Sequence, residues 1–246
     1  MDTQASVAEL EGSIEKRRRR RDLFELTFVY GLILLVIWTP RHWQPLFWSV
    51  SAVLTIAIAA MSYEGLKAMG ICAANLTQSL CGVAVVFGVA MLAVAFAVRL
   101  NTLHVPPSPF LFFKHYAGYV IWAGIQQLVL QCFFLSRSLR LLRDSTAAVA
   151  LSASMFAIAH LPNPILTFVC WICGVASCLF FLRYRNLFAV SVAHAILGIS
   201  IAITIPGPVD HNMRVGLGYL TYVDRTASLQ VDKAPLGIKP LASAKP

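Results

Sequence analysis

The chain has 246 residues, of which 58% are hydrophobic and 13% are charged, and its formal net charge is +9. A soluble globular domain carries about a quarter of its residues as charged side chains, so this composition excludes an ordinary soluble domain. The apolar residues also occur in long runs, which indicates that lipid surrounds them. We therefore expect one integral membrane domain with polar ends.

Seven apolar runs approach the roughly 20 residues that a helix needs to cross the hydrocarbon core. Polar or helix-breaking segments separate them, and each marks helix ends because irregular backbone is unstable in lipid. The sequence thus predicts an all-α, polytopic membrane helix bundle of about seven transmembrane helices, with six or eight as alternatives. The segment Met69–Thr77 could extend the third helix or lie along the membrane surface. The predicted spans are Leu23–Thr39, Leu46–Ser62, Ser79–Val98, Tyr116–Leu135, Thr146–Leu161, Pro164–Leu182 and Leu187–Ile205.

Basic residues favour one orientation of this bundle. Seven spans place the following on one side: Lys16–Arg21, Lys67, Arg137, Arg140, Arg143, Arg183 and Arg185. The short loops on the other side hold only Arg41, Arg99 and Lys114. The positive-inside rule then predicts a cytosolic N-terminus. A basic run can also bind nucleic acid or anionic lipid, but Lys16–Arg21 abuts a span without interleaved aromatic residues, so we expect no nucleic-acid partner.

Three parts follow from these patterns. Residues 1–22 form a polar, basic cytosolic segment, residues 23–205 form the transmembrane domain, and residues 206–246 form a polar tail outside the cytosol. Within the tail, Val215–Val223 could pack against the bundle, whereas the last dozen residues have the composition of a disordered chain.

The amide and imidazole side chains inside the predicted spans are Gln126, Gln127, Gln131, His160 and His194. Polar groups at that depth cost free energy unless they are paired or hydrated. Gln127 and Gln131 are four residues apart and should share a helix face, with Gln126 to one side. Their simplest role is hydrogen bonding between helices, yet three amides within six residues equally favour a functional site.

The two histidines differ in their surroundings. His160 lies near the end of its span, where an interfacial histidine is common, and Phe156 should stack one turn below it. His194 lies deeper, beside small residues such as Gly198 that let helices approach closely. A buried imidazole there needs a side chain, a water or a metal as partner.

These polar residues form three motifs that resemble the CPBP family of intramembrane endopeptidases, which includes CAAX prenyl proteases and bacteriocin self-immunity proteins. The family carries Glu-Glu-x-x-x-Arg, then Phe-x-x-x-His, then a later His usually followed four residues on by Asn or Asp. Here the stretches are Gln126–Gln131, Phe156–His160 and His194–Gly198, and the resemblance covers residues 116–205.

The resemblance implies roles for the matched positions. Gln126, Gln127, His160 and His194 stand at catalytic positions, and Gln131 and Phe156 would support the substrate, the oxyanion or the structure. In the family a motif-one glutamate is thought to activate water, and the histidines and the Asn to orient that water or stabilise the oxyanion.

This chain departs from the motifs at four positions, because glutamines replace both glutamates and the arginine, and Gly198 replaces the last polar residue. An amide can hold a water but cannot take its proton, and loss of a general base costs about 10²–10⁴ in rate. From Gly65 to Val209 the only acidic residue is Asp144, in a loop, so no nearby carboxylate can substitute. A histidine could instead act as the base, with Gln126 or Gln127 donating to the oxyanion.

The sequence leaves open whether the protein binds a metal cofactor. A catalytic zinc normally takes three protein ligands, and His160 with His194 supplies two. His211 could supply a third if the tail folds back over the mouth of the bundle.

Two functions of different class follow. The first is an intramembrane endopeptidase that hydrolyses a peptide bond in a membrane-associated substrate, in the bacterial inner membrane. The second is a catalytically impaired relative that binds a membrane-anchored peptide as a partner or scaffold. A transporter is less favoured, since the chain shows no paired repeats and no charged coupling residue in the membrane.

Overall fold

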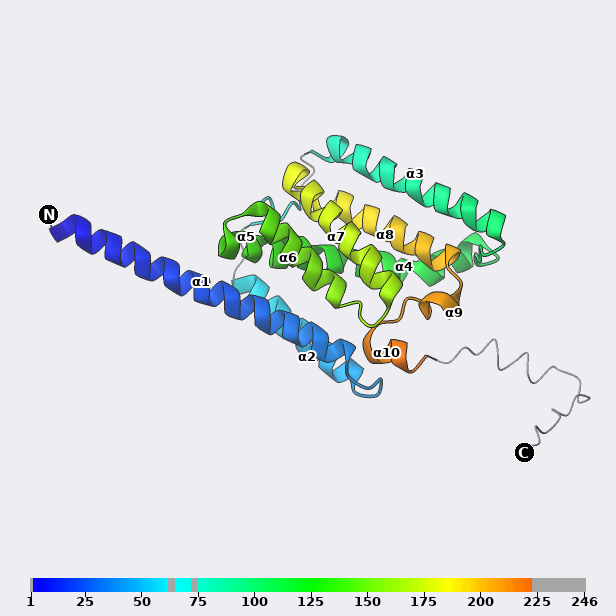
Figure 1. Ribbon diagram of the computed structural model, residues 1–246, viewed down its shortest axis with the longest axis horizontal. Coiled ribbons are helices and arrows are strands. Elements are labelled where there is room, and N and C mark those ends of the chain that lie inside the picture. The colour runs from blue at the N-terminus through cyan, green and yellow to red at the C-terminus, as the bar shows by residue number, and fades with distance from the viewer. Residues whose placement is uncertain (1, 62–64, 72–74, 223–246) are drawn as a thin grey trace, which may run out of the picture.

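The computed structural model describes residues 2–61, 65–71 and 75–222, and every regular element in these ranges is helical (Figure 1). Five helical stretches are long and apolar enough to cross a membrane: α2 (Gln44–Met61), α3 (Leu76–Leu100), the continuous stretch Pro109–Leu142, α7 (Pro164–Tyr184) and α8 (Leu187–Thr204). The stretch Pro109–Leu142 comprises α4 (Pro109–Gln127), the π-helical segment η1 (Leu128–Leu135) and α5 (Ser136–Leu142). The chain is therefore a multi-pass membrane protein.

Two further helices coincide with predicted spans without meeting the same criterion. α6 (Ser145–Ile158) has 14 residues and is shorter than a full crossing. α1 (Asp2–Ile37) joins the basic N-terminal segment and the first predicted span in one helix, and its N-terminal half projects beyond the bundle (Figure 1). Each of the seven predicted spans thus overlaps a helix within the described residues, and the count of seven crossings stays a prediction.

The helices begin where side chains can cap them. Asp144 accepts hydrogen bonds from the N–H groups of Thr146 and Ala147, and Asn163 and Asn186 do the same for α7 and α8. Such caps satisfy backbone donors that a helix start leaves unpaired. They fix the starts of α6, α7 and α8. Of the described residues in the segment Met69–Thr77, Leu76 and Thr77 belong to α3, whereas residues 69–71 are not helical; residues 72–74 lie outside the described ranges.

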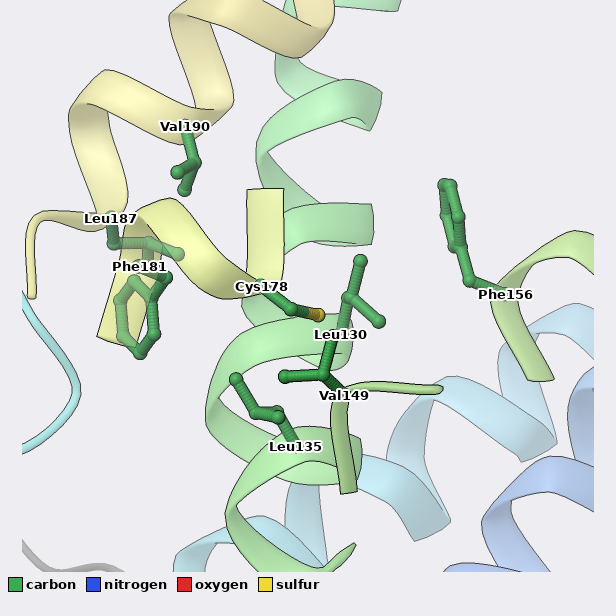
Figure 2. Close-up of a cluster of buried hydrophobic side chains, with 8 residues drawn as sticks. All are labelled: Leu130, Leu135, Val149, Phe156, Cys178, Phe181, Leu187 and Val190. Atoms are coloured by element: carbon green, nitrogen blue, oxygen red, sulfur yellow. The ribbon is translucent and has the colours of Figure 1, made fainter. Parts of the chain in front are cut away.

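The helices that carry the motifs pack around a common core. α6 lies along α7, and α8 lies against both α3 and α4. Buried side chains from η1, α6, α7 and α8 form one apolar cluster, shown in Figure 2: Leu130, Leu135, Val149, Phe156, Cys178, Phe181, Leu187 and Val190. This cluster holds the π-helical segment against α8, which carries His194, and against α6, which ends two residues before His160.

Ion pairs join α1 to α5 and to Arg143, the residue that follows α5. The guanidinium of Arg137 donates twice to the Glu25 carboxylate, at 2.9 Å from Nε and 2.6 Å from Nη2. Arg140 donates to Asp22 at 2.8 and 2.9 Å. The third pair joins Arg143 to Glu15 at the exposed end. The pairs place the basic N-terminal run and the α5 arginines at the same end of the bundle, and the cytosolic position of that end stays a prediction.

We expect Glu25→Ala to lower the free energy of unfolding by about 3–5 kcal/mol, because it leaves the guanidinium of Arg137 buried without its carboxylate. The side chains of Arg137 and Glu25 are only 3% and 10% exposed. Denaturant unfolding in detergent micelles measures the loss. Glu15→Ala is the matched control, since its pair with Arg143 is largely exposed and such pairs contribute about 1 kcal/mol or less. Equal effects of the two substitutions would contradict this account.

Candidate functional site

Two of the three glutamines are joined at the junction of α4 and η1. Gln131 Nε2 donates to Gln127 Oε1 at 2.9 Å and to Ser177 Oγ at 3.2 Å. Gln127 Nε2 lies 3.0 Å from Nδ1 of His194 on α8. Both amides are buried, with Gln131 only 1% exposed. The prediction that Gln127 and Gln131 share a face is confirmed, and we call the chain Ser177–Gln131–Gln127–His194 the amide relay.

The relay coincides with the π-helical segment. η1 begins directly after Gln127 and includes Gln131. Segments of π-helix are rare and occur often at functional sites, because the wider turn changes the direction of the side chains. The apolar pattern of the fourth span predicts an ordinary α-helix here, so this irregularity is a finding of the structure.

The donor and the acceptor in each hydrogen bond of the amide relay can be assigned by starting from Ser177. Ser177 Oγ donates to the backbone carbonyl of Gly174 at 3.1 Å, and a carbonyl can only accept. Ser177 Oγ therefore accepts from Gln131 Nε2, whose second hydrogen serves Gln127 Oε1. Gln127 in turn presents its N–H₂ group to His194 Nδ1, which must accept. The proton of a neutral His194 thus lies on Nε2.

His160 has the opposite tautomer. Its Nδ1 lies 2.7 Å from the carbonyl oxygen of Phe156, so Nδ1 carries the proton and Nε2 of the neutral ring is a bare acceptor. The Phe156 ring contacts both imidazoles, with centroid separations of 4.9 Å to His160 and 5.8 Å to His194. The predicted contact between Phe156 and His160 is confirmed. One histidine can accept a proton at Nε2 while the other can donate one.

A cavity of about 1330 Å³ brings the predicted site residues together. Gln126, Gln127, Phe156, His160 and His194 all line it, and most of the remaining lining is apolar. Gln126 is half-buried, and within the described part of the chain its amide makes no hydrogen bond. Gln131 lies behind Gln127 and supports the relay from outside the cavity. The arrangement is an apolar chamber with a few convergent polar groups, which is typical of a binding or catalytic site.

The tail folds back against the end of α6. The N–H of Gly216 donates to the carbonyl of Leu161 at 2.7 Å. Asn163 Nδ2 donates to the backbone carbonyls of Asp210 and Arg214, at 2.7 and 3.2 Å. Gly216 has φ of +53°, and a Cβ there would meet the Ile37 carbonyl oxygen at 2.4 Å, so no side chain fits at this position. The prediction that Val215–Val223 could pack is confirmed for its described part, while residues 223–246 lie outside the described ranges.

The folded tail does not bring a third histidine to the site. The His211 ring stacks on Tyr219 and Tyr222, with centroids 4.0 and 4.7 Å away. In the described part of the chain, no group of three or more His, Cys, Asp or Glu side chains is placed to hold a metal ion. The donor set of His160 and His194 alone therefore does not fit a catalytic zinc, which takes three protein ligands.

Among the described residues of the tail, Asp210 brings a carboxylate toward this region. It is buried, its Oδ1 accepts from the N–H of Asn212 at 2.9 Å, and burial raises the pKa of its carboxyl above the usual value. Asp210 is not among the residues that line the cavity. It therefore does not take the place of the missing motif-one carboxylate.

Sequence reasoning missed three contributors to this site: Ser177, Asn163 and Tyr119. Ser177 is a polar residue inside an apolar span, so the rule that singled out the glutamines could have found it. Asn163 shows in sequence only as a helix cap, because its bonds to the tail are tertiary. Tyr119 lines the cavity and gives no sequence signal that separates it from other aromatic residues of the span.

A comparison with protein-family models identifies the family that this part of the chain matches. Residues 108–199 match the family model described as type II CAAX prenyl endopeptidase, Rce1-like. These residues form an Rce1-like domain. The match contains all three motifs and confirms the resemblance to the CPBP and CAAX protease family, over nearly the same range as the predicted 116–205. Neither the comparison with curated proteins nor that with solved structures gives a match.

We expect Asn163→Ala to release the tail from the Rce1-like domain, because two backbone carbonyls lose their donor. Trypsin cleavage after Arg214 should then accelerate, and the free energy of unfolding should fall by about 1–3 kcal/mol. Asn186→Ala is the matched control, since Asn186 is an equally buried helix cap on the next helix. It should lower stability without exposing Arg214. Equal cleavage rates in the two variants would show that Asn163 does not hold the tail.

Proposed function

We propose that this protein is an intramembrane endopeptidase of the CAAX-protease type that hydrolyses a peptide bond in a membrane-anchored substrate. Its site is formed by Gln126, Gln127, His160 and His194. One observation carries the proposal: two histidines of opposite tautomer face one cavity in the domain that matches the family. A hydrolase needs such a pair, one group to take a proton and one to donate toward negative charge.

The chemistry follows from these tautomers. A water held by the Gln126 amide and His160 Nε2 attacks the scissile carbonyl carbon, and its proton passes to His160 Nε2. The carbonyl oxygen becomes an oxyanion that accepts a hydrogen bond from His194 Nε2–H. When the C–N bond breaks, the His160 imidazolium returns the proton to the departing amine. Water and peptide thus yield a carboxylic acid and an amine.

The buried amides of Gln127 and Gln131 hold His194 in the tautomer that this role requires. Gln127 holds its Nδ1 as an acceptor, and Gln131 and Ser177 hold Gln127 in turn. A preorganised donor in a site with little water stabilises developing charge more than the same donor in bulk water. Gln126 orients the water without taking its proton, so His160 is the sole base and turnover is slow.

Residue charge supports a topology for this enzyme. We place the end that holds Lys16–Arg21 and the α5 arginines in the cytosol, with seven crossings and α9 (Gly207–Asp210) and α10 (Gly216–Leu220) on the opposite side. The membrane is the inner membrane of a bacterial cell. A prenylated or otherwise anchored peptide would then enter the cavity from the lipid.

The second candidate is a non-catalytic relative that binds such a peptide as a partner or scaffold. The replacement of both motif-one glutamates by Gln126 and Gln127 favours it. The two candidates share one cavity and differ in whether the bound peptide bond breaks.

Cleavage of a prenylated CAAX peptide by the protein in proteoliposomes separates these candidates. We expect slow cleavage by the wild type and a loss of about 10² or more in His160→Ala and His194→Ala. Gln126→Glu restores a carboxylate beside the water and should raise the rate by about 10²–10⁴. Two controls repeat these changes on exposed residues, His42→Ala and Gln78→Glu, and should leave the rate unchanged.

The outcomes are distinct. Cleavage by the wild type that disappears with either histidine change excludes the binding-only candidate. No cleavage by the wild type but gained cleavage in Gln126→Glu establishes the second candidate. Inactivity of both proteins contradicts the proposed endopeptidase.

A further inference from the structure

Gly198 lies one turn beyond His194 on α8, at the position where the third motif usually carries Asn or Asp. The residue is buried and faces α4. A Cβ atom built on it would lie 1.7 Å from Tyr119 Oη and 2.4 Å from Tyr119 Cζ. The phenol end of Tyr119 therefore occupies the space that a side chain at position 198 would fill.

The Tyr119 hydroxyl also lies beside the proposed oxyanion donor. Residues 194 and 198 share one face of α8 because they are four apart. The rings of Tyr119 and His194 meet edge to face, with centroids 6.5 Å apart and planes at 72°. Tyr119 lines the cavity, and within the described residues its hydroxyl has no hydrogen-bond partner. A Tyr hydroxyl in such a half-buried position normally finds a partner, so this donor is available to a bound ligand.

We propose that Tyr119 donates its phenol hydrogen to the scissile carbonyl oxygen of the substrate, together with His194 Nε2–H. The hydroxyl thereby replaces, from a different helix, the amide that the third motif usually carries at position 198. This assignment rests on the proposed endopeptidase function. Tyr119 and Gly198 form a complementary pair, since the ring fits only over a residue without a side chain.

A packing role alone predicts a different result from a hydrogen-bond role. Phenylalanine keeps the ring over Gly198 and removes only the hydroxyl, so Tyr119→Phe separates the two. If the hydroxyl stabilises the oxyanion, kcat for the prenylated CAAX peptide falls by about 10²–10³ while KM changes little. Tyr184→Phe is the matched control, since Tyr184 is half-buried like Tyr119, packs on Phe180 and is not among the residues that line the cavity. It should leave kcat unchanged.

Moving the hydrogen-bond donor from position 119 to position 198 provides a rescue experiment. Tyr119→Ala removes ring and hydroxyl, and adding Gly198→Asn supplies an amide in the vacated space. We expect the double variant to recover about tenfold or more of the kcat lost in Tyr119→Ala. Gly198→Asn with Tyr119 intact should lose activity, because the two side chains cannot occupy one space. An unchanged kcat in Tyr119→Phe overturns the proposal, whatever the rescue gives.

An inactive wild type would count against the proposed function and leave Tyr119 to be judged by binding. The probe is then the same prenylated CAAX peptide at equilibrium. A hydrogen bond to its carbonyl predicts that Tyr119→Phe raises Kd by about twofold to tenfold while Tyr184→Phe does not. Equal Kd values in wild type and Tyr119→Phe overturn the assignment.

Discussion

The site depends on the hydrogen bond between Gln127 and His194. Burial of an amide and an imidazole in an apolar bundle is costly unless each finds a partner, and here each is the partner of the other. The bond also carries direction, because the relay behind it ends on the Gly174 carbonyl, which can only accept. One chain of contacts therefore lowers the cost of burial and fixes where the His194 proton lies. A glutamate at position 127 would change which nitrogen of His194 carries the proton. Gln127 itself therefore determines the tautomer of His194.

The rest of the fold holds the ends of this relay in place. The π-helical segment carries Gln131, and the cluster around Leu130 and Cys178 packs it against α7, which carries Ser177 (Figure 2). The buried pair of Arg137 and Glu25 fixes α5, which continues from the π-helical segment, against α1. Such a pair contributes specificity of docking more than net stability. The site thus sits where several helices are joined by polar contacts inside an otherwise apolar bundle.

Much of this arrangement is predictable from the sequence, because it depends on local patterns. Apolar runs and helix-breaking separators gave helix positions close to those observed, and the four-residue spacing of Gln127 and Gln131 predicted their shared face. The partners of those glutamines depend on tertiary packing, so Ser177 and the π-helical segment could not be derived. The same holds for Gly198: the sequence shows a missing polar side chain, and only the structure shows that Tyr119 fills its space. Tyr119, which occupies that space, lies 79 positions earlier in the chain than Gly198.

The opposed tautomers of His160 and His194 are the central claim, and nitrogen-15 NMR of histidine-labelled protein in micelles measures them directly. Two-bond couplings between ring carbon-bound protons and the ring nitrogens identify which nitrogen carries hydrogen, and His160→Gln and His194→Gln assign the signals. We predict a protonated Nδ1 and bare Nε2 in His160, and the reverse in His194. Gln127→Leu should alter the His194 signals and leave those of His160 unchanged. The same tautomer in both rings, or a protonated Nδ1 in His194, would contradict the account.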